Sequence, residues 1–427
     1  MHRFYVVVIT FLLLAACTNV SPPSPPIAAP PGSPTSAPAA PPLTALSTLA
    51  PTAPPSTALP SPAPKPTVLR VVYLKGGRVT LWTEGKGARQ LAEASFEQVR
   101  ISDDGQVIAY LGYGTAGNAG PYGIFSINAD GTNQRMPVGQ DYVRSIPSAE
   151  RIVSFDFAPA SHTLYFVTDQ YDLHRVNAAS EGPASVFGPV KGGPISFSPD
   201  GRWMTLYHPR ELILARSDGS EARVAFQEWH PDYAFGTAGP EIIWERDSSG
   251  FHLVAASGPQ DSPGNMTVWF IPVAGKPVKQ MSYTGPYGAD LSPDGRQVVY
   301  LYHQREPVEA HVVTADGKDA AFGSYASASY INLDFMGWAP DSKHFVLDLS
   351  KDGRVSVPFL CAVGEQPVKL TDTDNADSVR WVDAQRVLFV NHGAHGGDAL
   401  RIQRLGEPSA LVDAVQNSEF DYTYVKP

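Results

Sequence analysis

The sequence of 427 residues predicts an all-β fold, a single β-propeller built from four-stranded blades. Three observations predict it. A short turn motif, Phe197-Ser-Pro-Asp-Gly-Arg in its clearest copy, recurs along the chain. Each copy precedes a run in which β-branched and aromatic residues alternate with other residues, as strands require. The copies follow one another at steps of 40 to 56 residues, and such a period with several strands per unit is typical of propeller blades.

The turn motif has a physical basis in its central residues. Pro199 presets φ for the first corner of a β-turn, the Asp200 side chain can accept bonds from nearby backbone N–H groups, and Gly201 tolerates positive φ. Isolated hairpins are the alternative, but they do not explain repetition in register. The apolar residues that lead into the copies are Ile101, Phe157, Phe197, Trp244, Leu291, Trp338 and Trp381.

The chain begins with a predicted export signal, residues 1–17. One Arg precedes an apolar stretch that is short for a bilayer span, and small residues end it. The ending Leu14-Ala15-Ala16-Cys17 resembles a bacterial lipoprotein signal. The resemblance implies cleavage before Cys17 and lipid attachment to its sulfur, which would hold the protein on a membrane surface. An ordinary secretory signal with a chance Cys is the alternative.

Residues 18–66 are predicted to be a disordered linker. Of the 40 Pro residues in the chain, 17 lie between Ser21 and Pro66, mixed with Ala, Ser and Thr. This composition buries no core and favours an extended chain. At about 3.1 Å per residue the linker would reach roughly 100–150 Å, which would hold the following domain away from the membrane.

Residues 67–427 are expected to form one propeller whose two ends meet. Val68–Leu74 and Val79–Gly85 are predicted second and third strands without a first strand before them, whereas Glu419–Val425 is a predicted first strand. We infer that these segments complete one blade, which closes the ring and removes the open sheet edge. Dividing the 361 residues by a mean step of about 46.7 gives about 7.7 units, so we predict eight blades, with seven as the alternative.

Composition limits the classes of partner. Hydrophobic residues make up 43% of the chain and charged residues 17%, which suits strands buried between blades. The net charge of −10 argues against nucleic acid, because nucleic-acid binding needs a basic surface. Cys361 is the one cysteine after Cys17, and we expect it to be a buried small hydrophobe. A monomer is favoured, with the oligomeric state left open.

The Ser-Pro-Asp-Gly-Arg units, each followed by an alternating strand and an Asp-Gly hairpin, resemble the TolB-type repeat, which is also called WD-repeat-like. The propeller domains of dipeptidyl peptidase IV and prolyl oligopeptidase carry similar units. The resemblance covers residues 67–427 and implies the fold. It does not imply a role in the Tol system, because the preceding α/β domain of TolB has no counterpart here. Peptidase activity is not implied either, since no Gly-x-Ser-x-Gly motif is present.

The candidate binding site lies on the loops that enter each first strand and join each second strand to the third. Several of these loops carry aromatic and polar residues, which give large contact area at low entropic cost. We hypothesise that they line a shared mouth for a protein, peptide or envelope glycan; the alternative is that they pack on their own blades. The candidate residues are Tyr142, Arg144, Trp229, His230, Tyr233, Tyr287, His303 and Arg305.

Two loops invite a metal interpretation that the sequence does not favour. His392, His395 and Asp398 lie on a Gly-rich loop that lacks the fixed geometry of a metal site. The run from Asp372 to Asp377 alternates oxygen ligands but lacks the turn Gly and the final Glu of a calcium loop. We therefore predict solvated or inter-blade loops, with no metal and no cofactor.

The sequence thus favours a binding or scaffolding module, extracytoplasmic and anchored to a membrane through Cys17. The alternative function is a glycan-active hydrolase or lyase whose site is assembled from scattered loops. Residues separated in this way do not appear as a motif, and no catalytic residue can be named. Convergent carboxylates or His side chains at the centre of the ring would favour the enzyme, whereas an aromatic or merely polar mouth would favour binding.

Overall fold

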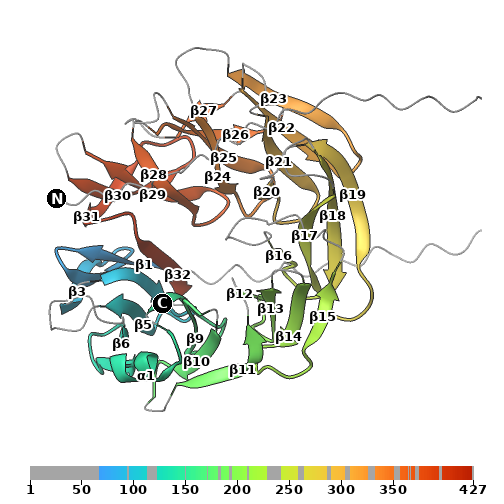
Figure 1. Ribbon diagram of the computed structural model, residues 1–427. Coiled ribbons are helices and arrows are strands. Elements are labelled where there is room, and N and C mark those ends of the chain that lie inside the picture. Colours follow the sequence, from blue (N-terminus) through green and yellow to red (C-terminus); the bar gives the residue numbers. More distant parts are fainter. Residues whose placement is uncertain are drawn as a thin grey trace, which may run out of the picture. The chain divides into compact units, whose positions relative to one another are not determined.

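The computed structural model shows an eight-bladed propeller within the unit Pro64–Pro427. Within the described residues, eight four-stranded antiparallel sheets follow one another around a ring (Figure 1). The predicted fold, with eight rather than seven blades, is confirmed. The structure describes residues 67–93, 96–112, 123–149, 151–170, 172–180, 184–191, 195–208, 211–227, 242–257, 264–285, 290–302, 308–325, 332–350, 356–363, 365, 367–370, 375–393 and 397–425.

The four strands of each blade are termed A to D from the inside outward. In that order, blade 1 has β32 (Phe420–Val425), β1 (Val68–Lys75), β2 (Arg78–Thr83) and β3 (Gly87–Glu93), and blade 2 has β4 (Phe96–Ile101), β5 (Val107–Gly112), β6 (Gly123–Asn128) and β7 (Arg135–Val138). Blade 3 has β8 (Ile152–Phe157), β9 (Thr163–Thr168), β10 (Asp172–Asn177) and β11 (Ser185–Lys191), and blade 4 has β12 (Ile195–Phe197), β13 (Trp203–His208), β14 (Glu211–Arg216) and β15 (Arg223–Phe226).

Blades 5 to 8 repeat the same A-to-D order. Blade 5 has β16 (Ile242–Trp244), β17 (Gly250–Ser257), β18 (Gly264–Pro272) and β19 (Val278–Gly285), and blade 6 has β20 (Asp290–Leu291), β21 (Gln297–Tyr302), β22 (Val308–Thr314) and β23 (Asp319–Tyr325). Blade 7 has β24 (Asn332–Trp338), β25 (His344–Ser350), β26 (Pro358–Ala362) and β27 (Val368–Lys369), and blade 8 has β28 (Ala376–Trp381), β29 (Arg386–His392), β30 (Asp398–Arg404) and β31 (Ala410–Val415).

Blade 1 closes the ring as the sequence predicted. Its strand A, β32, comes from the end of the described chain, and its strand B, β1, comes from the beginning. The two pair antiparallel in an unbroken register that runs from Val68 opposite Val425 to Tyr73 opposite Phe420. This pairing leaves β1 with a hydrogen-bonded neighbour on each side, so the ring has no exposed inner edge at its junction.

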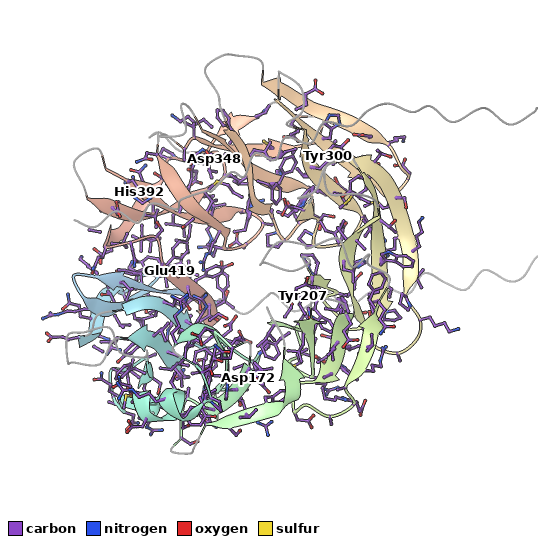
Figure 2. All side chains as sticks on the ribbon, viewed as in Figure 1. Asp172, Tyr207, Tyr300, Asp348, His392 and Glu419 are labelled. Atoms are coloured by element: carbon purple, nitrogen blue, oxygen red, sulfur yellow. The ribbon has the colours of Figure 1, made fainter. Side chains whose placement is uncertain are left out.

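The hydrophobic core lies between adjacent blades, because alternate residues of each strand face opposite neighbours. On β1, Leu69 and Val71 pack in a cluster with residues of blade 8, whereas Val72 packs with residues of blade 2. At the interface of blades 5 and 6, the rings of Tyr283 and Tyr300 stack with centroids 5.6 Å apart, and Figure 2 shows Tyr300 among the side chains of that interface. Each blade is therefore held by burial against two others.

Hydrogen bonds within the A–B turn, the turn between strands A and B, explain the recurring motif. In blade 4, Ser198 Oγ accepts a bond from Trp203 N at 2.9 Å and donates to Asp200 Oδ1 at 2.7 Å. The Arg202 N–H donates to the same Asp200 oxygen at 3.0 Å. The equivalent side-chain bonds join Ser292 and Asp294 in blade 6. The motif is therefore a structural turn rather than a site of chemistry.

The glycine of this turn is required by both conformation and space. Gly201 has φ +67°, and a Cβ at that position would lie 2.5 Å from the Pro159 carbonyl oxygen of blade 3. The turn also contacts the following blade, because Asp200 N donates to Ser248 Oγ at 3.1 Å. The same bond recurs from Asp294 N to Ser342 Oγ at 3.0 Å. Each such turn therefore joins a blade to its neighbour.

One short helix forms where the sequence analysis expected a loop, in the segment that carries the candidate residues Tyr142 and Arg144. This helix, α1 (Gln140–Ser145), has Asp141 in its first turn and Arg144 in its last turn, where their charges favour the helix dipole. Val143 is fully buried and packs in the cluster between blades 2 and 3. Burial of one apolar residue explains why this loop folds into a helix, which the sequence analysis missed.

We expect Gly201→Ala to destabilise the propeller more than Gly317→Ala. Both glycines have positive φ, but a Cβ at Gly317 would meet nothing within 4 Å. The strained conformation costs about 1 kcal/mol at either site, and the contact with Pro159 adds roughly 1–3 kcal/mol at Gly201. Urea unfolding followed by circular dichroism measures both variants, and equal losses would contradict the close packing of the A–B turn.

Candidate functional site

Charged side chains on the innermost strands hold the closing strand β32. On one side, Arg380 Nη1 of β28 donates to the Phe420 carbonyl at 2.6 Å, and its guanidinium lies 4.7 Å from the Phe420 ring centroid. On the other side, Ile101 N of β4 donates to Asp421 Oδ2 at 2.8 Å. Arg100 of β4 also faces Glu419 at 3.8 Å. Blades 8 and 2 therefore both bind the strand that completes blade 1.

The Asp421 carboxyl has a strongly perturbed pKa. Loss of hydration raises the pKa of Asp421 to about 6, against the opposing effects of the Ile101 N–H and the Arg100 charge. The negative charge of Asp156 on β8 raises it further, and loss of hydration also raises the pKa of Asp156. These two carboxyls share Arg100 as a compensating cation, which is the arrangement of a structural charge network.

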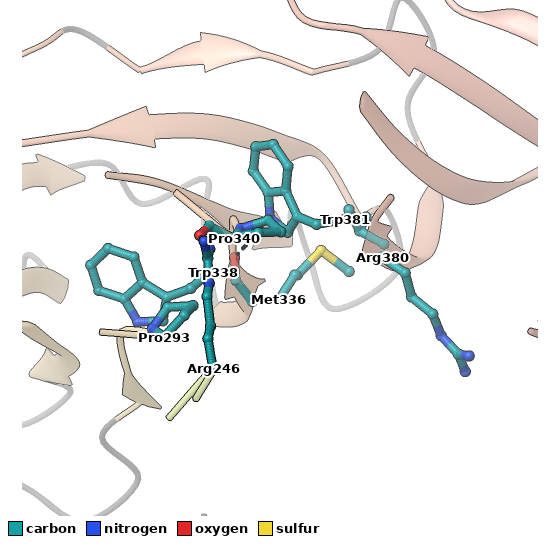
Figure 3. Close-up of a pocket in the computed structure, with 9 residues that line it drawn as sticks. Arg246, Pro293, Met336, Trp338, Pro340, Arg380 and Trp381 are labelled. Carbon is teal, nitrogen blue, oxygen red and sulfur yellow. Dashed lines mark hydrogen bonds between the residues drawn. The ribbon is translucent and has the colours of Figure 1, made fainter. Parts of the chain in front are cut away.

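A cavity of about 440 Å³ opens where blades 5 to 8 meet (Figure 3). Its lining residues come from A–B turns and from the inner strands of blades 7 and 8. Because strands alternate in direction, A–B and C–D turns share one end of the ring, so the cavity lies opposite the predicted loops. The lining residues are Arg246, Pro293, Met336, Gly337, Trp338, Pro340, Val379, Arg380 and Trp381.

Two tryptophans fix the walls of this cavity. Trp338 Nε1 donates to the Asp290 carbonyl of blade 6 at 3.1 Å, and Trp381 Nε1 donates to the Gly337 carbonyl of blade 7 at 3.1 Å. Each indole thus reaches one blade back, and both are nearly buried. Their N–H groups are used by the protein, so the indoles present apolar edges to the cavity rather than free donors.

The two arginines of the lining have different surroundings. Arg246 is exposed, and its guanidinium donates to the Pro340 carbonyl, so the side chain reaches from the turn of blade 5 to the turn of blade 7. Arg380 extends away from the other labelled residues in Figure 3, toward its partners on β32. Arg246 is therefore the cation at the entrance, whereas Arg380 belongs mainly to the structural network.

Of the predicted site residues, two lie within the described part of the chain. Tyr142 packs edge-on against Phe166, and its hydroxyl lies 3.0 Å from His174 Nδ1. Burial raises the pKa of this hydroxyl. Arg144 is exposed on α1. Tyr142 thus contacts blade 3, and neither Tyr142 nor Arg144 is among the residues that line the cavity.

The remaining predicted positions fall outside the described residues. They are Cys17, Trp229, His230, Tyr233, Tyr287, His303 and Arg305, together with His395 and Asp372 of the two loops considered for metals. Cys361 is described and is buried, as predicted. No helix in the described part of the chain is both long enough and apolar enough to span a membrane.

The described parts of the two possible metal loops make ordinary polar contacts. His392 Nδ1 lies 2.8 Å from Asp398 Oδ1, which forms a histidine–carboxylate pair across strands β29 and β30. Asn375 Nδ2 donates to the His392 carbonyl at 3.3 Å. Among the described residues, no group of three or more His, Cys, Asp or Glu side chains is placed to hold a metal ion.

Sequence reasoning missed the cavity because its residues stand in the repeat motif itself. Pro293 and Pro340 occupy the Pro position of the turn in their copies, and Arg246 occupies the same position in the copy that begins at Trp244. The Arg at position 246, where the motif expects Pro, is the one sequence feature that could have indicated a site at this end of the ring. This feature identifies one residue, whereas the cavity needs the ring to bring three turns together.

No protein-family model matches the chain, and no curated protein sequence matches it. Solved structures do match. Dipeptidyl peptidase 4 from Porphyromonas gingivalis has a TM-score of 0.55 at 8% identity, covering 81% of this chain and 58% of its own. Prolyl oligopeptidase B from Galerina marginata has a TM-score of 0.51 at 13% identity, covering 76% and 52%. TolB from Acinetobacter baumannii has a TM-score of 0.33 at 12% identity, covering 61% and 65%.

These matches extend over little more than half of the length of the two peptidases. At such low identity the likeness shows a shared fold, and it does not carry over an activity. The resemblance to peptidase propellers that the repeat motif indicated is therefore confirmed at the level of fold: the chain is an eight-bladed β-propeller.

We expect Asp421→Asn to alter the pH dependence of stability. Because the pKa is raised from 3.8 to about 6, the folded protein binds more protons than the unfolded chain between these values. Wild-type stability therefore falls as the pH rises through this window. The Asn amide oxygen can still accept from Ile101 N, so the variant should gain roughly 1–3 kcal/mol relative to wild type between pH 4 and 7, measured by urea unfolding.

Asp200→Asn is a control that should change the pH dependence of stability in the opposite direction. Burial raises the pKa of Asp200, but bonds from Ser198 and Arg202 outweigh it and hold the pKa below its usual value. The wild-type carboxylate therefore stabilises the fold above the unfolded pKa, and this stabilisation is lost as the pH falls. The variant should lose stability relative to wild type at neutral pH and approach it in acid. A pH-independent difference for Asp421→Asn would contradict its raised pKa.

Proposed function

We propose that this protein is a binding module whose cavity at the A–B turn end of the ring holds an extended peptide segment of a protein partner. The observation that carries the proposal is the lining of the cavity. Met336, Val379 and the two prolines provide an apolar surface, and Arg246 provides a positive charge at the entrance. This combination fits an apolar side chain with a carboxylate beside it.

The same lining favours binding over the alternative, a glycan hydrolase or lyase. Among the described residues that line the cavity there is no carboxylate and no histidine, whereas glycoside hydrolysis requires two carboxyl groups flanking the substrate. Asp156 and Asp421, on the inner strands β8 and β32, both interact electrostatically with Arg100, and Asp421 also accepts the Ile101 N–H. Their contacts support a role in holding the ring together.

The proposed location is extracytoplasmic, with residues 1–17 as a lipoprotein signal, residues 18–66 as a linker and residues 67–427 as the propeller. Lipid on Cys17 would hold the chain at the membrane, and the Pro-rich linker would let the propeller reach partners about 100–150 Å away. The sequence pattern of the first 66 residues supports this arrangement. A binding domain on a long tether suits capture of a partner within the cell envelope.

Selection from a display library of random twelve-residue peptides, with the purified full-length chain as bait, tests the binding proposal. We expect enriched peptides to carry an acidic residue beside an apolar one. Met336→Glu places a negative charge in the cavity and should weaken their binding at least about tenfold, because an unpaired charge beside the ligand costs more than about 1.4 kcal/mol. Fluorescence anisotropy measures the affinities.

Val368→Glu is the matched control for this measurement. Val368 lies on the outer strand of the same blade and is 61% exposed, so the added charge stays in water. Peptide affinity should be unchanged in this variant. The proposal fails if the wild type enriches no peptide, or if Met336→Glu binds the enriched peptides as well as Val368→Glu does.

Labelling with radioactive palmitate tests the anchor. We expect the chain expressed in bacteria to incorporate the label through Cys17 and to partition with membranes. Cys17→Ala should abolish labelling, because the thioether sulfur is lost, whereas Cys361→Ala should retain it, because Cys361 is buried in β26. Label that survives in Cys17→Ala would contradict the lipoprotein interpretation.

A further inference from the structure

A second cavity, of about 340 Å³, lies between blades 1 and 2 at the A–B turn end of the strands. Three of its eight lining residues are cationic, and the lining contains no carboxylate side chain. This differs from the chain as a whole, whose net charge is −10. The lining residues are Arg70, Leu81, Thr83, Lys86, Gly87, Ala88, Arg89 and Ala129.

The two arginines are held in place by the backbone of blade 2. Arg70 Nη1 donates to the Gly105 carbonyl at 2.8 Å, and Arg70 Nε is buried without a hydrogen-bond acceptor. Arg89 Nη1 donates to the Asp130 carbonyl at 3.0 Å, and its Nη2 donates to the Ala129 carbonyl. Neutral carbonyls orient these guanidinium groups but do not neutralise their charge, so the cavity keeps a positive potential.

The carboxylates of the neighbouring turns have hydrogen-bond partners outside the cavity lining. Glu84 Oε1 accepts from Arg386 of blade 8 at 2.9 Å, and its other oxygen faces Leu69 N. The Asp130 carboxylate accepts from the backbone N–H of Thr132 at 2.9 Å and from its hydroxyl at 2.6 Å. The Thr132 bonds, together with the attraction between the Asp130 carboxylate and Arg89, lower the pKa of Asp130. Asp130 therefore offsets part of the Arg89 charge, and Arg70 and Lys86 supply the rest of the positive potential.

We propose that this cavity binds a small organic oxyanion, a molecule with a phosphate or carboxylate group and a short apolar portion. The guanidinium groups of Arg70 and Arg89 are planar donors suited to oxyanions. Lys86 lies exposed on the C–D turn of blade 1, where its flexible ammonium can close over the anion. The Leu81 and Ala129 side chains provide the apolar contact. The site is separate from the peptide-binding cavity and does not depend on it.

Thermal unfolding of the full-length chain with defined anions tests the proposal. The probes are inorganic phosphate, phenyl phosphate and benzoate, each compared with sodium chloride at equal ionic strength. We expect phenyl phosphate or benzoate to raise the Tm by roughly 2–4 °C at about ten times its Kd, because ligand that binds only the folded state stabilises it. Phenyl phosphate ahead of benzoate identifies a phosphate site, and the reverse order identifies a carboxylate site.

Three variants separate specific binding from a general salt effect. Lys86→Gln should weaken binding about fivefold or more, and Ala88→Glu, which removes no existing hydrogen bond, should abolish it by adding a negative charge. Lys276→Gln is the matched control, because Lys276 precedes the outer strand of blade 5 as Lys86 does in blade 1. The proposal is wrong if no anion stabilises the wild type beyond chloride, or if Lys86→Gln and Ala88→Glu respond like Lys276→Gln.

Discussion

The fit of each A–B turn between its neighbours is the constraint on which the ring depends. In blade 4, Gly201 leaves no room for a side chain because the Pro159 carbonyl of blade 3 lies against it. The next residue back, Asp200, donates its N–H to Ser248 of blade 5. One four-residue turn therefore fixes three successive blades. In linear repeat proteins each unit contacts two neighbours through broad faces; here a polar turn adds a directional contact that sets the spacing of the sheets.

Much of the fold could be predicted from the sequence, because the residues that form the A–B turn are also the residues that join neighbouring blades. The residue types at Pro199, Asp200 and Gly201 indicate a turn, and the alternating apolar residues after it indicate a strand. The repeat could therefore be recognised from this single sequence. The shared blade followed from strands left without partners at the two ends. The helix α1 was not predictable in the same way, because six residues give little periodicity and its formation depends on burying Val143 between blades 2 and 3.

The candidate sites were less accessible to sequence reasoning, since both cavities are assembled by the ring. Arg246, Pro293 and Pro340 stand at the same motif position in three successive units, and their proximity follows from the radius of the ring rather than from spacing. Arg70 and Arg89 look like ordinary exposed strand residues until blade 2 supplies the carbonyls that orient them. Of the aromatic residues predicted to bind a ligand, Tyr142 is the one in the described residues, and it packs on His174 and Phe166.

The pairing of β1 with β32 has a consequence for how the molecule is made. A chain that leaves the ribosome or an export channel from its N-terminus presents β1 long before its partner exists. Until Phe420–Val425 appears, Leu69, Val71 and Tyr73 lack part of their cluster, and one strand edge stays open to other chains. The entropic cost of bringing such distant segments together grows only slowly with their separation in sequence. The risk of aggregation therefore depends on how long the edge of β1 stays unpaired, rather than on the free energy of closing the ring. Until biosynthesis is complete, an open edge of this kind is exposed to aggregation.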